Sequence, residues 1–248
     1  MPLKVHQFPC LNDNYGFLLK DEASGEVACV DSPDADAIQA ELDRLGWRLS
    51  LIMNTHWHPD HAGGNARLKA AFGCEIVGPQ EVTRIAPLDR PLAEGDEVML
   101  GQTRFEVMET GGHTLGHISY YDRPDRVVFV GDTLFALGCG RVFEGTAGQM
   151  WTSLSRLAAL PGDTLVYCAH EYTAANARFA LSVDQSPELK ARADQVFAAR
   201  ARGEPTVPTR IDVELASNPF LRAPLLKRGM GEVEAFAAVR QAKDVFKG

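Results

Sequence analysis

The chain has little of several features that would place it in a special class of protein. Its 248 residues include only 5 cysteines, at positions 10, 29, 74, 139 and 168, with no C-x-x-C pair, so we expect reduced thiols and a cytoplasmic location. No apolar run approaches the roughly 20 residues of a spanning helix, and Met1–Phe8 lacks a signal-peptide pattern. The net charge of −8 argues against a nucleic-acid partner. We therefore expect a globular monomer without a nucleic-acid or membrane partner.

Histidine is also scarce, with 7 in the chain, yet three of them lie with an aspartate in Thr55–His61, directly after an apolar run. Imidazole and carboxylate groups are ligands of zinc and similar divalent metals. In extended backbone, residues i and i+2 point to the same side, and a following proline disfavours helical angles, so His56 and His58 should converge on one point. Asp60 and His61 lie past the bend and can face a second point. The segment thus offers more ligands than one tetrahedral ion needs from a single loop.

Further candidate ligands follow other predicted strands. Val127–Val130 and Leu165–Cys168 are apolar runs of the buried-strand type, and Asp132 and His170 come just after them. Open α/β architectures tend to place their sites at such carboxyl ends of strands. Alone, Asp132 could be a turn or cap residue and His170 a core histidine. Together with the first cluster, they favour a metal site.

Two histidines compete for one more ligand position. His113 and His117 lie in a glycine-rich segment after the strand-like Thr103–Met108, and the glycines favour a loop over a helix. Their i, i+4 spacing therefore need not mean that both bind metal, and the residues alone leave the choice open. His6 stands apart near the start of a strand, and we interpret it as structural.

The pattern of elements changes near residue 172. Strand-like runs alternate with helices before it, and helices dominate after it. The predicted helices are Asp34–Leu45, Asn65–Phe72 with Asn65 as its cap, Gly148–Leu160, one from Ser186 and Pro187 to about Arg202, and Gly231–Lys243 with Val233, Phe236 and Val239 on one face. Cys29 and Cys168 are predicted core residues, and Cys139, between two glycines, a turn residue. Composition alone indicates mixed α and β structure followed by helices.

Motifs along nearly the whole chain resemble glyoxalase II, the hydroxyacylglutathione hydrolases of the metallo-β-lactamase superfamily. The T-H-x-H-x-D-H run at 55–61 is specific to the superfamily only. The segments that carry the narrower resemblance are Gly138–Thr146, His170–Thr173, Gly203–Pro208, Asn218–Arg222 and Val239–Asp244. Shorter matches lie at Leu11–Tyr15, Ala62–Asn65, His113–His117 and Gly131–Phe135.

The resemblance implies an α/β (α+β) fold, the αββα four-layer sandwich of the metallo-β-lactamases with an all-helical C-terminal domain. Residues 1–172 would form the catalytic domain and residues 173–248 the domain that binds the glutathione thioester. It also implies two divalent ions, with zinc expected and iron or manganese also compatible with these ligands. One ion would be held by His56, His58 and His113 and the other by Asp60, His61 and His170. Asp132 would bridge them, which makes Asp60 and Asp132 the candidate catalytic carboxylates.

The implied reaction is hydrolysis of S-D-lactoylglutathione and related 2-hydroxyacyl-glutathione thioesters to glutathione and D-lactate by a metal-bound hydroxide, the second step of methylglyoxal detoxification. Arg240 and Lys243 would bind the glycine carboxylate of glutathione, although these residues alone would suggest a solvated helix face. Arg141, Phe143 and Tyr172 would line the groove. Many members of the family have Lys at 141 and Tyr at 143, whereas this chain has Arg141 and Phe143. Arg141 keeps the positive charge, but Phe143 lacks the hydroxyl donor of a tyrosine. The rival functions are a mononuclear-iron persulfide dioxygenase and another hydrolase of the same fold.

Overall fold

The computed structural model describes residues 3–248, so the first two residues of Met1–Phe8 lie outside it. The chain divides into two compact units. The first extends to Glu109 and resumes over Gly116–Gly131. The second consists of Thr110–Leu115 and Asp132–Gly248. The predicted ligands are therefore shared between the units, with His56, His58, Asp60 and His61 in the first and His113, Asp132 and His170 in the second.

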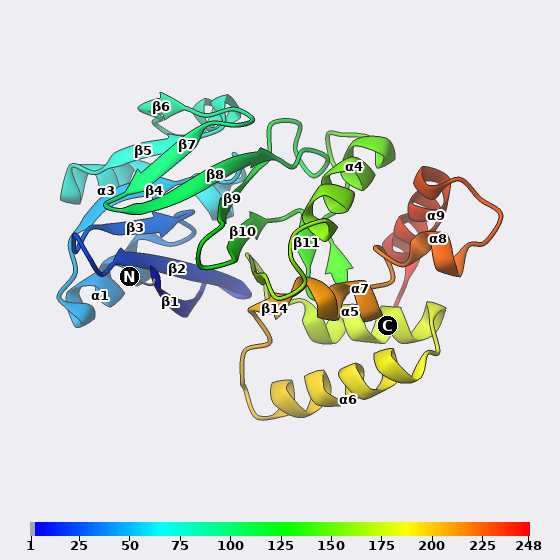
Figure 1. The fold of residues 1–248 in the computed structure, drawn as a ribbon. Coiled ribbons are helices and arrows are strands. Elements are labelled where there is room, and N and C mark those ends of the chain that lie inside the picture. Colours follow the sequence, from blue (N-terminus) through cyan, green and yellow to red (C-terminus); the bar gives the residue numbers. More distant parts are fainter. Residues whose placement is uncertain (1–2) are drawn as a thin grey trace. The chain divides into compact units, whose positions relative to one another are not determined.

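The first unit contains a six-stranded sheet in the order β1-β2-β3-β4-β5-β6 (Figure 1). Its strands are β1 (Leu3–Cys10), β2 (Asn14–Asp21), β3 (Val27–Val30), β4 (Leu49–Met53), β5 (Glu75–Gly78) and β6 (Arg90–Pro91). The strands from β1 to β3 are antiparallel neighbours, and those from β3 to β6 are parallel. Val30 pairs with Met53, so β3 and β4 end at the same edge of the sheet. Residues that follow these two strands, including the histidine-rich segment, start from this edge.

Helices cover one face of this sheet. Their apolar residues recur at helical spacing, so each helix has one apolar side that packs on the strands. The helices are α1 (Ala35–Leu45) and α3 (Asn65–Phe72). Ile38, Leu42 and Leu68 from these helices share a core cluster with Leu18 and Ile52 of the sheet, and all five are fully buried. Helix α1 begins one residue later than predicted, since Asp34 caps its start, and it ends at Gly46 in the left-handed conformation.

A second layer of strands packs on the other face of the first sheet. These strands are β7 (Glu97–Leu100), β8 (Thr103–Glu109), β9 (Ile118–Asp122) and β10 (Val127–Gly131), each antiparallel to the next. Phe17 of β2 alternates in direction with Leu18, and its ring lies 5.7 Å from that of Phe129 on β10. The first unit thus has a helix layer and two strand layers. It also holds two short helical turns, α2 (Pro59–Ala62) and η1 (Gln80–Arg84).

The second unit is mostly helical. Its helices are α4 (Ala147–Ala158), α5 (Thr173–Val183), α6 (Pro187–Ala201), α7 (Ile211–Ser217), α8 (Ala223–Leu226) and α9 (Glu232–Val245). Its strands are β11 (Leu134–Phe135), β12 (Gly138–Cys139), β13 (Leu165–Cys168) and β14 (Thr209–Arg210). Small and branched residues such as Ala177, Ala180 and Leu189 form the core between α5 and α6. Trp151 of α4 packs on Phe236 of α9, with ring centroids 5.9 Å apart.

Most predicted elements are confirmed, and the differences have local causes. Asn65 is the first residue of α3 rather than its cap, because its side chain bonds to Ser32 and Asn54 instead. Cys139 lies buried in β12 and is not a turn residue. Val233 is 42% exposed and does not share the buried face of Phe236.

Helix α4 begins one residue earlier than predicted, since Thr146 forms a capping box with Gln149. None of the helices in residues 3–248 is long and apolar enough to cross a membrane.

Candidate metal centre

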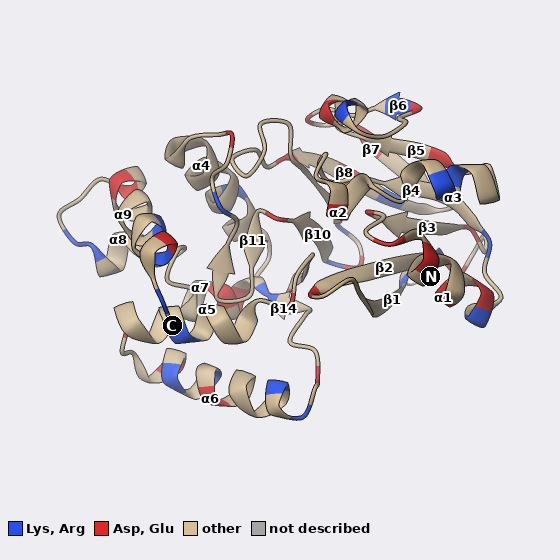
Figure 2. Ribbon diagram, turned by 180° about the vertical axis from the view of Figure 1, so that it is seen from behind, with Lys and Arg blue, Asp and Glu red and all other residues tan. Residues whose placement is uncertain are grey.

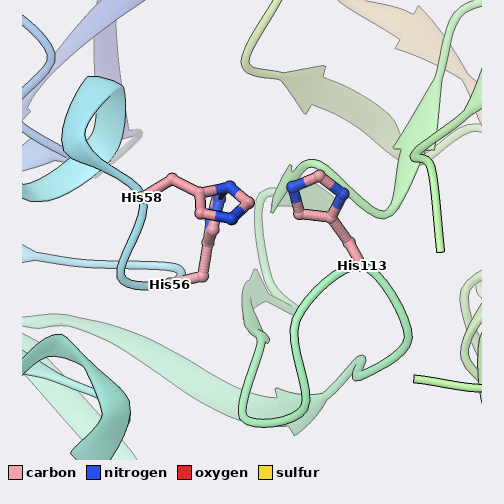
Figure 3. Close-up of side chains that lie close together, drawn as sticks. All are labelled: His56, His58 and His113. Atoms are coloured by element: carbon pink, nitrogen blue, oxygen red, sulfur yellow. Dashed lines mark hydrogen bonds between the residues drawn. The ribbon is translucent and has the colours of Figure 1, made fainter. Parts of the chain in front are cut away.

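The first pair of predicted ligands lies on the loop after β4. Figure 3 shows His56 and His58 projecting from this loop, and their rings meet edge-on with planes at 78°. His56 Nε2 lies 3.0 Å from His58 Nδ1. The backbone of His58 is extended, with φ −60° and ψ 148°, as the following proline predicts. The prediction that these two rings converge is therefore confirmed.

The second pair lies on the helical turn α2, one bend further along the chain. His61 Nε2 is 3.6 Å from Asp60 Oδ2. The amide of Asn14 donates to both the carbonyl oxygen and Oδ2 of Asp60, at 3.2 Å each, which fixes the direction of the carboxylate. The segment thus offers two pairs of candidate ligands, one on extended backbone and one on a helical turn.

Asp31 orients the histidines of this loop, and our reading of the sequence missed it. It accepts hydrogen bonds from Thr55 N at 2.7 Å and Thr55 Oγ1 at 2.8 Å, and it lies 2.8 Å from His61 Nδ1. Because the Thr55 hydroxyl donates to Asp31, its oxygen can accept from His56 Nδ1, 3.0 Å away. Both rings then carry their proton on Nδ1, which makes Nε2 the nitrogen that could bind a metal. Asp31 comes directly after β3, at the carboxyl end of a strand, so the rule that found Asp132 could have found it.

In the second unit, one carboxylate lies between two imidazole rings. Asp132 Oδ2 is 3.4 Å from His113 Nε2, and Asp132 Oδ1 is 3.3 Å from His170 Nε2. Two ligand atoms at about 2.1 Å from one tetrahedral zinc ion are about 3.4 Å apart. Both contacts match this separation, and they use different oxygens of the same carboxylate. The arrangement fits a carboxylate that serves two ions.

The loop that carries His113 depends on glycine. Figure 3 shows His113 on this loop, and its Nδ1 lies 2.9 Å from the carbonyl oxygen of Arg141, which leaves Nε2 directed at Asp132. Gly112 has φ +140°, and a Cβ there would lie 2.8 Å from the backbone of Met150. Only glycine fits this position without strain.

His117 belongs to the first unit and is fully buried. Its ring stacks on that of His56, with centroids 4.9 Å apart and planes at 28°. This contact supports the interpretation of His117 as a residue that packs beside a ligand.

A cavity of about 340 Å³ in the second unit adjoins Asp132. Its lining residues are His113, Asp132, Phe135, Cys139, Arg141, Phe143, Tyr172, Asn176, Arg240 and Lys243. Phe143 packs edge-on against His113, with centroids 5.2 Å apart, and Tyr172 stacks flat on His170 at 4.6 Å. Every substrate-binding residue predicted from the sequence thus lines this cavity, which combines three basic groups with aromatic walls.

The basic residues of α9 that line the cavity are Arg240, which is buried, and Lys243, which is half-buried. Figure 2 shows both basic and acidic segments on α9. Arg240 is 7% exposed, donates from Nη1 to the carbonyl oxygen of Cys139 at 3.0 Å, and lies over the ring of Phe220. Its Nε has no hydrogen-bond partner among residues 3–248. Arg240 is therefore not part of a solvated helix face.

Lys243 is half-buried and donates to the carbonyl oxygen of Ala175 at 3.2 Å. Burial, and then the positive charges of Arg240, Arg178 and Arg141, lower the pKa of Lys243 to about 8. A lysine with this pKa is mostly charged at neutral pH, and a nearby anion would stabilise its charged form.

Known proteins are similar to this chain in both fold and sequence. The family model for the metallo-β-lactamase superfamily matches residues 30–170, and the model for the hydroxyacylglutathione hydrolase C-terminus matches residues 171–246. Hydroxyacylglutathione hydrolases of Maricaulis maris and Erythrobacter litoralis are 52% and 50% identical to it, over 98% of this chain and 99% and 100% of theirs. The crystal structure of ETHE1 from Myxococcus xanthus is similar with a TM-score of 0.71 and 28% identity, covering 96% of this chain and 90% of that one.

The sheets and the helical C-terminal region are those of a metallo-β-lactamase fold, and the His and Asp side chains form clusters consistent with a binuclear metal site. The class is thus a metal-dependent hydrolase of the metallo-β-lactamase superfamily. Within that class, the chain belongs to the hydroxyacylglutathione hydrolase (glyoxalase II) family.

Proposed function

We propose that this protein hydrolyses S-D-lactoylglutathione and related 2-hydroxyacyl-glutathione thioesters to glutathione and D-lactate, the second step of methylglyoxal detoxification. The observation that carries the proposal is the single cavity in which Asp132 and His113 share a wall with Arg141, Arg240 and Lys243. Candidate metal ligands and cationic side chains therefore line the same cavity, which supports a small anionic substrate. The hydroxyacylglutathione hydrolases that are about half identical over the full length support the same reaction.

We propose that seven side chains hold two divalent ions. His56, His58 and His113 would hold one ion, Asp60, His61 and His170 the other, and Asp132 both. The distances within each unit support this assignment, since the pairs 60–61, 113–132 and 132–170 have the separations expected of two ligands on one ion. Zinc suits nitrogen and carboxylate ligands, and iron and manganese are also compatible with them.

Two divalent ions held by these residues would lower the pKa of a bound water molecule and so supply a nucleophile for the thioester carbonyl at neutral pH. The residues of the chain supply orientation and charge. Asp31 and the Arg141 carbonyl hold His61 and His113 with Nε2 toward the site. The leaving group is a thiolate, and because a thiol has a pKa of about 8.5, it can leave without a dedicated general acid.

The cavity is suited to the tripeptide part of the substrate. We propose that Arg240 and Lys243 bind its glycine carboxylate, with Arg141, Phe143 and Tyr172 along its length. The buried Nε of Arg240 and the half-buried amine of Lys243 support this role, because a charged ligand offsets the cost of burying them. We also propose residues 1–172 as the catalytic domain and residues 173–248 as the thioester-binding domain, a division that the ranges of the two family models support. The protein would act as a cytoplasmic monomer.

The direct test is a rate assay with purified protein and S-D-lactoylglutathione, in which the released thiol is measured. We expect hydrolysis that chelation abolishes and added zinc restores. His113→Ala should lose most activity, whereas His6→Ala, which changes a histidine on β1, should keep it. Oxygen consumption with a persulfide of glutathione, without thioester hydrolysis, would contradict the proposal.

A further inference from the structure

Asp244, which does not line the cavity, contacts two of the cationic residues that do. It lies in the last turn of α9, and its Oδ1 accepts a hydrogen bond from Arg240 Nη2 at 2.9 Å. The same oxygen lies 3.9 Å from Nε of Arg141. One carboxylate oxygen therefore contacts two guanidinium groups that come from distant parts of the sequence.

The position of Asp244 is unfavourable for the helix itself. An acidic residue in the last turn opposes the helix dipole, whose C-terminal end is negative. The order of the pair, with Arg240 four residues before Asp244, is also the less favourable one for an ion pair along a helix. Helix stability therefore does not explain an aspartate here.

The cavity gives a better reason. Arg141, Arg240 and Lys243 are like charges on one small wall, and they repel one another. Arg141 is the most exposed of them, with a side chain that is 64% exposed. Besides burial, the charges of Arg240, Arg178 and Arg141 lower the pKa of Lys243, whereas the charge of Asp244 raises it. Asp244 is thus placed to hold the two guanidinium groups together despite their repulsion.

We propose that Asp244 is a positioning residue that sets the directions of Arg141 and Arg240 for the glutathione thioester without lining the cavity itself. The inference rests on the proposed function. Asp244 does not touch the substrate. It reduces the entropy that Arg141 would lose when an anion binds, because the side chain is already restrained.

The proposal predicts a result of opposite sign from simple electrostatics. Asp244→Asn removes a negative charge beside an anionic substrate, so charge alone predicts a lower KM. Loss of positioning predicts a higher KM, and we expect an increase of about three- to tenfold, with kcat within about twofold of the unaltered protein. Asp244→Glu, which keeps the carboxylate, should recover part of the loss.

The experiment measures KM and kcat for S-D-lactoylglutathione at low and high salt. Asp194→Asn, the same change on the exposed surface of α6, serves as the matched control and should leave both constants unchanged. The increase in KM should shrink at high salt, because the exposed ion pair of Arg141 with Asp244 that orders the side chain is itself screened by salt. If the unaltered protein hydrolyses the thioester and Asp244→Asn has an equal or lower KM, the positioning role of Asp244 is overturned and the proposed function stands. No hydrolysis by the unaltered protein overturns the proposed function and this inference together.

Discussion

Removing the charge of Lys243 should weaken substrate binding and also remove a pH dependence. Lys243→Met keeps an apolar stem over the rings of Phe179 and Phe246, which lie 5.3 and 5.7 Å from the amine. It deletes the positive charge and the hydrogen bond from the amine to the carbonyl oxygen of Ala175. A charged contact to a partly exposed carboxylate is worth about 1 kcal/mol, so we expect KM to rise about five- to tenfold. Since the contact forms equally in the ground and transition states, kcat should stay almost unchanged.

The pH dependence follows from the lowered pKa of Lys243. With a pKa of about 8, the amine is charged below pH 8 and becomes neutral above it. About nine-tenths of the molecules carry the charge at pH 7 and about one-tenth at pH 9. An anionic substrate binds the charged form better, so kcat/KM should be high below pH 8 and fall as the pH rises through that value. Lys243→Met should show no such fall.

The assay is initial-rate hydrolysis of S-D-lactoylglutathione between about pH 6.5 and about pH 9.5, with the uncatalysed rate subtracted. A neutral thioester without the tripeptide is the control substrate, and its kinetics should not respond to Lys243→Met. The reasoning is refuted if the variant keeps the wild-type KM, or if its kcat/KM still falls through pH 8 as that of the unaltered protein does.

Three further predictions concern single residues. Asp132→Ala should lose both metal ions and nearly all of kcat with the fold intact by circular dichroism, whereas His117→Ala should lose far less metal; equal losses would mean that the choice of His113 over His117 as ligand is wrong. Asp31→Asn should lower metal affinity about 10- to 100-fold in a chelator competition, because an amide has only one acceptor oxygen and cannot accept from both Thr55 N and His61 Nδ1, while Asp21→Asn, at another buried carboxylate of the first unit, should not. Phe143→Tyr should lower KM for the glutathione thioester by about threefold through a new hydroxyl donor, and an unchanged KM would show that position 143 contributes only its ring.

Much of the site could be predicted from the sequence because its ligands come directly after strands. The strand β4 fixes where the histidine-rich loop starts, and the proline after His58 fixes the backbone there, so the pairing of His56 with His58 depends on local geometry alone. The placement of Asp132 between His113 and His170 could not be derived in this way. It depends on contacts from Asp132 to His113 and His170, which lie far from it in the sequence, and a turn residue would have shown the same local pattern.

The helices of the second unit show a different limit. Spacing placed α9 nearly to the residue, yet it assigned Val233 to the wrong face and left Arg240 on a solvated one. A helical pattern gives the direction of each side chain around the axis but not what packs against that side. Arg240 is buried because β12 supplies the carbonyl oxygen of Cys139 and α9 supplies Asp244. Only the assembled unit shows that a charged residue occupies a buried position.

The central claim, that two ions act together through Asp132, is tested most directly by counting metal against activity. The metal-free protein would be titrated with zinc, with the bound metal measured by mass spectrometry and S-D-lactoylglutathione hydrolysis measured at each point. We expect activity to reach its maximum at two ions per chain and to stay low while only one is bound. Full activity with a single bound ion would contradict the claim.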